Sequence, residues 1–170
     1  MVKTKETEEQ VQENEMVEKA RQIAWDAHSG QIDKTGGPYI NHAWRVSEMK
    51  IIDSPIKRIV ALLHDVIEDT DVTYDDLREQ GFSEEIINSI RLVTKTKEIN
   101  IDEYFKRIKA DPVARAVKIA DLTHNMDKSR WDEPDAGWKD LSEDERKNRL
   151  KWFKVKRKEY ENWRDYLQQE

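Results

Sequence analysis

The stretch Ala61-Leu-Leu-His-Asp-Val-Ile-Glu-Asp-Thr70 begins as an apolar run and ends with four ionisable side chains in six positions. Apolar residues recur before and through it at steps of three and four, which predicts a helix with one buried face. They are Ile56, Ile59, Val60, Leu63 and Ile67. In such a helix His64 lies one turn before Glu68, and Asp65 lies one turn before Asp69. The ionisable groups then lie at the edge of the interior, where charge is costly unless it is paired or bound to a metal.

The length and composition of the chain indicate one soluble domain. A chain of 170 residues can bury one sizeable core, and 36% hydrophobic with 39% charged residues is typical of small helices with charged outer faces. The formal net charge of −6 argues against a nucleic-acid-binding protein, because the phosphate backbone favours a basic surface. Neither a signal peptide nor a membrane-spanning run is seen, so we expect no membrane partner and a cytoplasmic location. Since the chain has no cysteine, any metal must be held by nitrogen and oxygen ligands.

The rest of the chain also has helical patterns, so the predicted fold class is all-α, with about seven to nine helices. Residues 1–13 are polar and charged and are expected to form a flexible tail before a single domain over residues 14–168. The last helix is expected at about 142–168, and residues 31–38 and 127–141 are expected to be loops. Capping residues predict the start of six helices. They are Ser54, Thr73, Ser83, Asn100, Asp111 and Ser142.

The histidines of the chain are candidates for a metal site. There are four of them, His28, His42, His64 and His124. Two of these, together with Asp65 and Asp121, would form a site of two imidazoles and two carboxylates drawn from three separate helices. Such a donor set suits Mn²⁺, Fe²⁺ or Zn²⁺. A lone histidine near an apolar face is as often a satisfied core residue, so the spacing alone leaves both interpretations open.

The order His42, His64-Asp65, Asp121 resembles the H…HD…D pattern of the HD-domain metal-dependent phosphohydrolases. Between residue 20 and about residue 130, the sequence is similar to the hydrolase domain of RelA/SpoT homologues, above all the stand-alone small alarmone hydrolases. The matching segments are AHSGQ (27–31), GGPYINH (36–42), ALLHDVIEDT (61–70), LVTK (92–95) and VKIADLTHNM (117–126). The resemblance implies an HD-domain helical bundle. It also implies removal of the 3′-pyrophosphate from guanosine tetra- or pentaphosphate, the alarmones of the stringent response, giving GDP or GTP.

The same resemblance implies roles for individual residues. It implies one divalent metal, Mn²⁺ first with Fe²⁺ or Zn²⁺ as alternatives, held by His42, His64, Asp65 and Asp121. It also implies an acidic pair, Glu68 and Asp69, that positions and deprotonates the attacking water. Glu68 is the better base because it is in phase with His64, although the pair could instead only end the helix, where acids oppose the helix dipole. The implied substrate contacts are Asn125 to the nucleotide, with Lys34 and Lys118 to phosphate or sugar.

One position departs from the family pattern. The family usually has Arg-Lys where this chain has Asp33-Lys34, and that arginine is expected to stack on the guanine base. An aspartate cannot stack as a guanidinium does, so the base that the protein accepts stays open. Arg45 and Arg130 are the candidates to supply the missing cation. Two alternative functions are therefore kept: a phosphohydrolase acting on another phosphorylated nucleotide or on NADPH, and a non-catalytic nucleotide-binding module.

Overall fold

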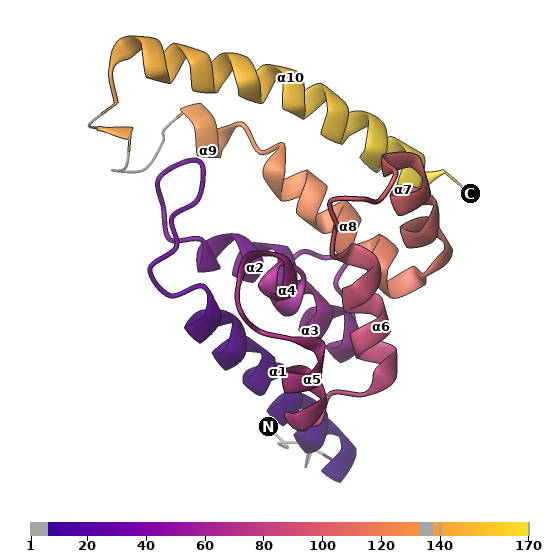
Figure 1. Ribbon diagram of the computed structural model, residues 1–170. Helices are drawn as coiled ribbons and strands as arrows, with labels where there is room; N and C mark the ends of the chain where they lie inside the picture. The colour runs from indigo at the N-terminus through magenta and orange to yellow at the C-terminus, as the bar shows by residue number, and fades with distance from the viewer. Residues whose placement is uncertain (1–6, 133–137, 140, 170) are drawn as a thin grey trace, which may run out of the picture.

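The computed structural model describes residues 7–132, 138–139 and 141–169, and every regular element in these ranges is a helix. Eight helices have six residues or more and two have four, so the all-α prediction is confirmed. In chain order (Figure 1) they are α1 (Glu8–Ala27), α2 (Ile40–Ser47), α3 (Pro55–Leu63), α4 (Val66–Asp69), α5 (Tyr74–Glu79), α6 (Glu84–Val93), α7 (Ile101–Ala110), α8 (Pro112–Asn125), α9 (Ser129–Asp132) and α10 (Glu143–Gln168).

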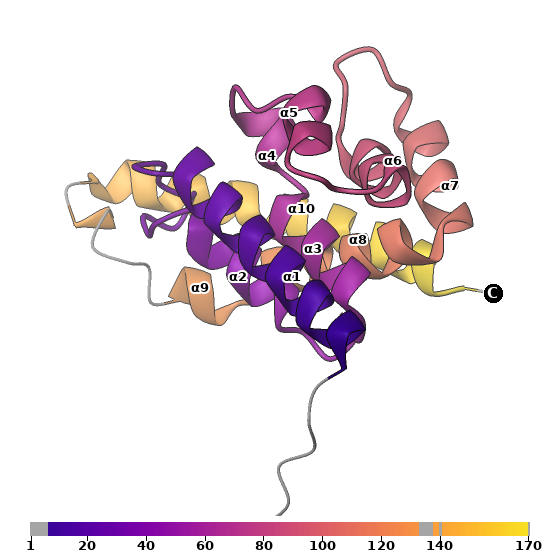
Figure 2. The same cartoon turned by 90° about the horizontal axis from the view of Figure 1, so that it is seen from below.

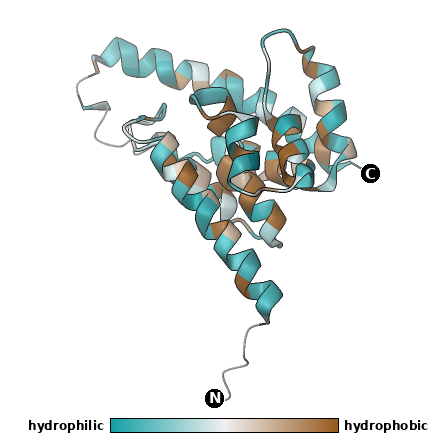
Figure 3. Cartoon of the chain, turned by 60° about the horizontal axis from the view of Figure 1, so that its bottom comes forward, coloured by the Kyte–Doolittle hydropathy of each residue, from teal (hydrophilic) through white to brown (hydrophobic). Residues whose placement is uncertain are grey.

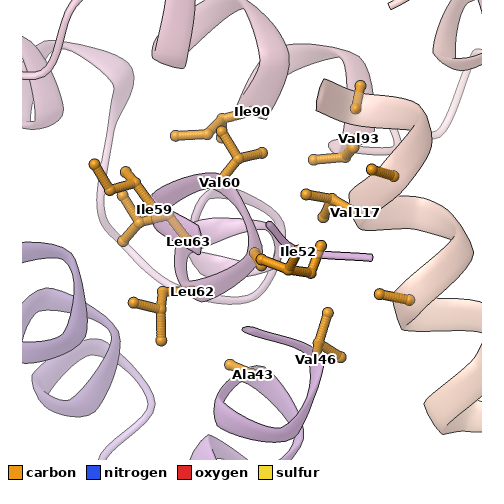
Figure 4. Close-up of a cluster of buried hydrophobic side chains, with 14 of the residues drawn as sticks. Ala43, Val46, Ile52, Ile59, Val60, Leu62, Leu63, Ile90, Val93 and Val117 are labelled. Carbon is orange, nitrogen blue, oxygen red and sulfur yellow. The ribbon is translucent and has the colours of Figure 1, made fainter. Parts of the chain in front are cut away.

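Helices α3 and α8 form the centre of the domain. Helix α3 packs against α1, α2, α6 and α8, and α8 also packs against α2, α6, α7 and α10. Figure 4 shows side chains of α2, α6 and α8 gathered around those of α3, among them Val46, Ile90 and Val117, all fully buried. Figure 3 shows hydrophobic residues gathered where the helices face one another and hydrophilic residues outside, including the first turns of α1. The segments that carry the candidate ligands therefore belong to the buried centre of the fold.

The prediction of one continuous helix through residue 70 is wrong, because the helix is interrupted at His64 and Asp65. Helix α3 ends at Leu63, and a single further turn, α4, follows from Val66 to Asp69. The imidazole Nδ1 of His64 lies 2.7 Å from Ala61 O, the carbonyl that would accept the next helical hydrogen bond. The one-turn relation beyond the break is kept, since Asp69 N donates to Asp65 O over 2.9 Å.

The six helix starts predicted from capping residues are confirmed, since each of those side chains accepts a hydrogen bond from a backbone N–H of the first turn. Helix α1, however, begins at Glu8 and not near residue 13, because Thr7 and Gln10 form a capping box there. The loop expected at 127–141 contains the short helix α9. Residues 1–6 of the expected tail lie outside the described residues.

Helix α10 lies along α8 and also packs against α7 (Figures 1 and 2). The first half of α10 and the segment before it both contact the loop between α1 and α2 through one backbone carbonyl of that loop. Lys34 O accepts hydrogen bonds from Trp138 Nε1 over 3.0 Å and from Arg149 Nη1 over 3.2 Å. Trp138 packs with Phe153 of α10 in a small cluster apart from the main core. The 31–38 loop therefore makes hydrogen bonds with the start of the last helix and with the segment before it.

Among the described helices, none is both long enough and apolar enough to cross a membrane.

Candidate metal centre and its cavity

Three separate elements bring the candidate ligands together. His42 comes from α2, His64 and Asp65 from the break between α3 and α4, and Asp121 from the buried side of α8. His42 Nε2 lies 3.2 Å from Asp121 Oδ1 and 3.9 Å from Asp65 Oδ2. His64 Nε2 lies 2.8 Å from Asp65 Oδ2 and 3.8 Å from Asp121 Oδ1. Donor atoms of His42, His64 and Asp65 all lie within 4.8 Å of one another, which is the spacing of groups that share an ion.

The environment of His64 fits a metal ligand. Because Ala61 O can only accept, His64 Nδ1 must carry the proton of their 2.7 Å hydrogen bond, which leaves the Nε2 lone pair of the neutral ring free. Nε2 is buried and makes no hydrogen bond among the described residues, although Asp65 Oδ2 lies 2.8 Å away. A buried nitrogen of this kind, facing two carboxylates, suits a divalent cation.

The charged side chains of the cluster shift one another's pKa values. Burial disfavours the imidazolium of His64, but the carboxylates of Asp65 and Asp121 outweigh burial and raise the pKa of His64 to about 9. Burial likewise opposes the charge of Asp121, whereas the Lys118 ammonium, 2.7 Å from its Oδ2, holds the pKa of Asp121 well below its usual range. The Asp121 carboxylate is therefore ionised at neutral pH, and a divalent cation would compete with a proton for His64 Nε2.

The acidic pair lies on α4, one turn beyond the ligands. Burial raises the pKa of Glu68 above its usual value, against a 2.8 Å hydrogen bond from the backbone N–H of Lys95 to Glu68 Oε2. Burial and the charge of Asp65 also raise the pKa of Asp69. The Glu68 carboxylate is thus held in one orientation and takes up a proton more readily than a fully solvated glutamate.

A cavity of about 650 Å³ opens over the cluster, a volume within the usual range for small-molecule sites. Nine of the eleven residues given a candidate role from the sequence line it. They are Lys34, His42, Asp65, Glu68, Asp69, Lys118, Asp121, Asn125 and Arg130. His64 is buried and does not line this cavity. Arg45 lines a second, smaller cavity of about 260 Å³, whose wall shares Asp33, His42 and Arg130 with the first. Asn125 Nδ2 donates to Asp121 Oδ1 over 2.6 Å, so this amide orients a ligand candidate as well as lining the cavity.

Sequence reasoning missed one wall of this cavity. The last helix was expected only as a helix at about 142–168, with no part in the site, but its residues Trp152 and Lys156 line the cavity. They belong to a stripe at helical spacing, which is the signal that could have found it. The stripe comprises Trp152, Lys156, Glu159, Tyr160 and Trp163. Tyr39 was also missed, and its hydroxyl donates a hydrogen bond to Asp65 Oδ2.

The position of Asp33 is settled by contacts within the protein. Its Oδ2 accepts from Arg130 Nη2 over 2.6 Å, and its Oδ1 accepts from Thr35 N and Thr35 Oγ1 over 2.8 and 2.7 Å. Burial alone would raise the pKa of Asp33, but these hydrogen bonds hold it below its usual value. Asp33 and Arg130 both line the main cavity, so the cavity wall carries a paired, neutralised aspartate there.

The fold and the order of the ligand candidates define a known class. Residues 20–139 match the family described as the HD domain. Since the match spans more than half of the chain, the protein belongs to the HD-domain family.

Two curated relatives extend this finding. The bifunctional (p)ppGpp synthase/hydrolase SpoT of Escherichia coli K12 is 39% identical over 119 residues, which cover 61% of this chain and 16% of SpoT. The guanosine-3′,5′-bis(diphosphate) 3′-pyrophosphohydrolase of Aquifex aeolicus VF5 is 35% identical over 132 residues, 71% of this chain and 18% of that enzyme.

The chain therefore spans less than a fifth of the length of these relatives. A solved structure of comparable size is described as a metazoan ortholog of SpoT that hydrolyzes ppGpp. It matches with a TM-score of 0.59 and 24% sequence identity, over 89% of this chain and 85% of the other. At that level of identity the likeness shows the shared fold.

Proposed function

We propose that the protein is a divalent-metal-dependent pyrophosphohydrolase that removes the 3′-pyrophosphate from guanosine tetra- or pentaphosphate. The observation that carries the proposal is the meeting of two imidazoles and two carboxylates with an acidic pair in one cavity. The names of the relatives given above include (p)ppGpp hydrolase activity. The HD-domain match over residues 20–139 contains the candidate ligands and the acidic pair. The proposed cofactor is Mn²⁺, with Fe²⁺ or Zn²⁺ as alternatives.

The proposed ligands are His42, His64, Asp65 and Asp121. When bound, a divalent metal supplies positive charge that shields phosphoryl oxygens and makes water more acidic. The ammonium of Lys118, 2.7 Å from Asp121, keeps that carboxylate ionised for binding. Tyr39 donates to Asp65 and so fixes the orientation of a second carboxylate.

The proposed base is Glu68, with Asp69 beside it. Its carboxylate accepts the proton of the water that attacks the phosphorus next to the 3′ oxygen. The bond from that phosphorus to the 3′ oxygen breaks, pyrophosphate leaves, and the 3′ oxygen of GDP or GTP gains a proton. The Lys95 backbone N–H holds Glu68 Oε2 and so keeps the carboxylate pointing into the cavity that it lines. Lys34 and Asn125, also in the cavity wall, are the proposed contacts to phosphate or sugar and to the nucleotide.

The second candidate keeps this chemistry and changes the substrate to another phosphorylated nucleotide or NADPH. The observation that favours it is Asp33, which lines the cavity with its charge taken up by Arg130. A wall of this kind presents a neutral ion pair where a single arginine would present a net positive charge. A substrate panel separates the two candidates.

The test uses the purified full chain with Mn²⁺ and measures pyrophosphate released from guanosine tetraphosphate. Parallel reactions with NADPH and with guanosine triphosphate are assayed for phosphate and pyrophosphate. We expect release from guanosine tetraphosphate, its loss on chelation, and its loss in Asp65→Asn. The matched control is Asp71→Asn, an exposed residue outside the cavity, which is expected to retain activity. Turnover of NADPH alone would favour the second candidate. Tight nucleotide binding without metal or turnover would favour a non-catalytic module.

A further inference from the structure

His124 lies against one of the proposed metal ligands, yet the chemistry described above does not use it. Its Nδ1 is 2.7 Å from His42 Nδ1, and the two ring centroids are 4.9 Å apart. At this distance the two nitrogens share one hydrogen bond, so one carries a proton and the other accepts it. His42 Nδ1 is therefore occupied, and Nε2 is the nitrogen that faces Asp121 and Asp65.

We propose that His124 is a positioning residue for the metal centre. In this arrangement His42 Nδ1 carries the proton and donates it to the lone pair of His124 Nδ1. A neutral imidazole carries only one proton, so His42 Nε2 is left with a lone pair directed at the cation. The inference rests on the metal dependence in the proposed function, and it assigns to His124 the choice of which His42 nitrogen is protonated.

The two histidine ligands are oriented by different kinds of group. His64 is held by the carbonyl of Ala61, a backbone group that side-chain substitution leaves in place. His42 is held by the side chain of His124, which a single substitution removes. The metal centre therefore depends on His124 in a way that has no equivalent on the His64 side.

The position of His124 is itself well fixed. It lies near the end of α8, three residues after Asp121, so one helix presents both a ligand and the partner of another ligand. Its backbone carbonyl accepts from Arg130 Nη1 over 3.2 Å, and Arg130 Nη2 binds Asp33. Contacts thus run from the 31–38 loop through Arg130 and His124 to His42, and each step is a hydrogen bond.

The test measures the dissociation constant for Mn²⁺ in the absence of substrate, by calorimetry on the full chain. His124→Phe keeps a planar ring and removes the acceptor, and we expect Mn²⁺ affinity to fall by about 10- to 100-fold. His124→Asn places an amide oxygen near the position of Nδ1 and is expected to recover most of that loss. Thr123→Ala is the matched control, because its exposed side chain bonds only to its own helix at Ile119 O. Thermal unfolding of each metal-free variant is recorded beside it.

The outcomes are distinct. Equal Mn²⁺ affinity in wild type and His124→Phe would overturn the inference, and so would an equal loss in His124→Asn and His124→Phe. A wild type that binds no divalent cation would overturn it as well. If the wild type binds Mn²⁺ and the variants follow the expected order, the inference stands even when guanosine tetraphosphate is not hydrolysed. That last result would count against the proposed substrate alone.

Discussion

Arg130 Nη2 donates to Asp33 Oδ2 over 2.6 Å, and the two side chains are largely buried, with exposed fractions of 16% and 10%. The other oxygen of Asp33 accepts from Thr35 and from Gly37 N, so one carboxylate organises the loop and also ties it to α9. The aspartate that departs from the family pattern is therefore built into the framework of the cavity. Its substitution is expected to act on stability as well as on substrate choice.

We expect Asp33→Ala to lower the free energy of unfolding by roughly 3 kcal/mol, because it leaves a largely buried guanidinium without its partner. Chemical denaturation of the metal-free protein measures this. Asp53→Ala is the matched control, since Asp53 pairs with Lys57 over 2.7 Å but has a side chain 65% exposed, and its loss is expected to be much smaller. A change at Asp33 no larger than that at Asp53 would contradict a structural role for the pair.

Glu68→Gln tests the proposed base. The amide keeps the size of the side chain and cannot take a proton, so kcat is expected to fall by about 10²- to 10⁴-fold. Pyrophosphate release gives the rate, and Mn²⁺ binding, measured separately, is expected to be retained because Glu68 is not a proposed ligand. Glu85→Gln, at an exposed position of α6, serves as the control. Unchanged turnover in Glu68→Gln would remove Glu68 from the mechanism.

The raised pKa of Glu68 predicts the acidic side of the pH–rate profile. Partial burial keeps this carboxyl protonated to a higher pH than that of a fully solvated glutamate, whose pKa is 4.5. Only the ionised form accepts a proton from water, so the rate should increase as pH rises through the raised pKa. The measurement is kcat/KM against pH at saturating metal, with folding followed by circular dichroism. The rise in rate on the acidic side of the profile should also be seen in Asp69→Asn. A rate that is constant down to pH 4.5 would disagree with Glu68 as the base.

A bound cation should stabilise the fold, because it binds the assembled site and not the unfolded chain. At a free concentration 100 times its dissociation constant, the gain is about 2.7 kcal/mol. Thermal unfolding with and without Mn²⁺ measures it, and chelation should reverse it. His64→Ala should abolish the shift, whereas His28→Ala should retain it even if the starting stability is lower, because His28 is a buried histidine outside the cluster. A shift of equal size in both variants would argue against the proposed ligands.

Local signals in the sequence predicted most of the helices. The N-caps at Ser54 and Asp111 were predictable because a cap depends on residues within one turn of itself. The break after Leu63 was not, because it depends on an imidazole competing for a backbone carbonyl in a buried environment. Nor could helical spacing tell that Arg130, and not Arg45, lines the main cavity, since that depends on where α9 lies relative to the 31–38 loop.

The proposed ligands are scattered along the chain, on α2, at the break after α3 and on α8. A cation bound to all four would join segments up to 79 residues apart, from His42 to Asp121. A link that closes a long loop limits the freedom of the unfolded chain more than one that closes a short loop. Neither α2 nor α8 could then unfold locally without release of the ion. The centre that is proposed to hydrolyse a nucleotide would then also hold the fold together. The rate at which a protease digests the protein would therefore depend on whether the metal is bound.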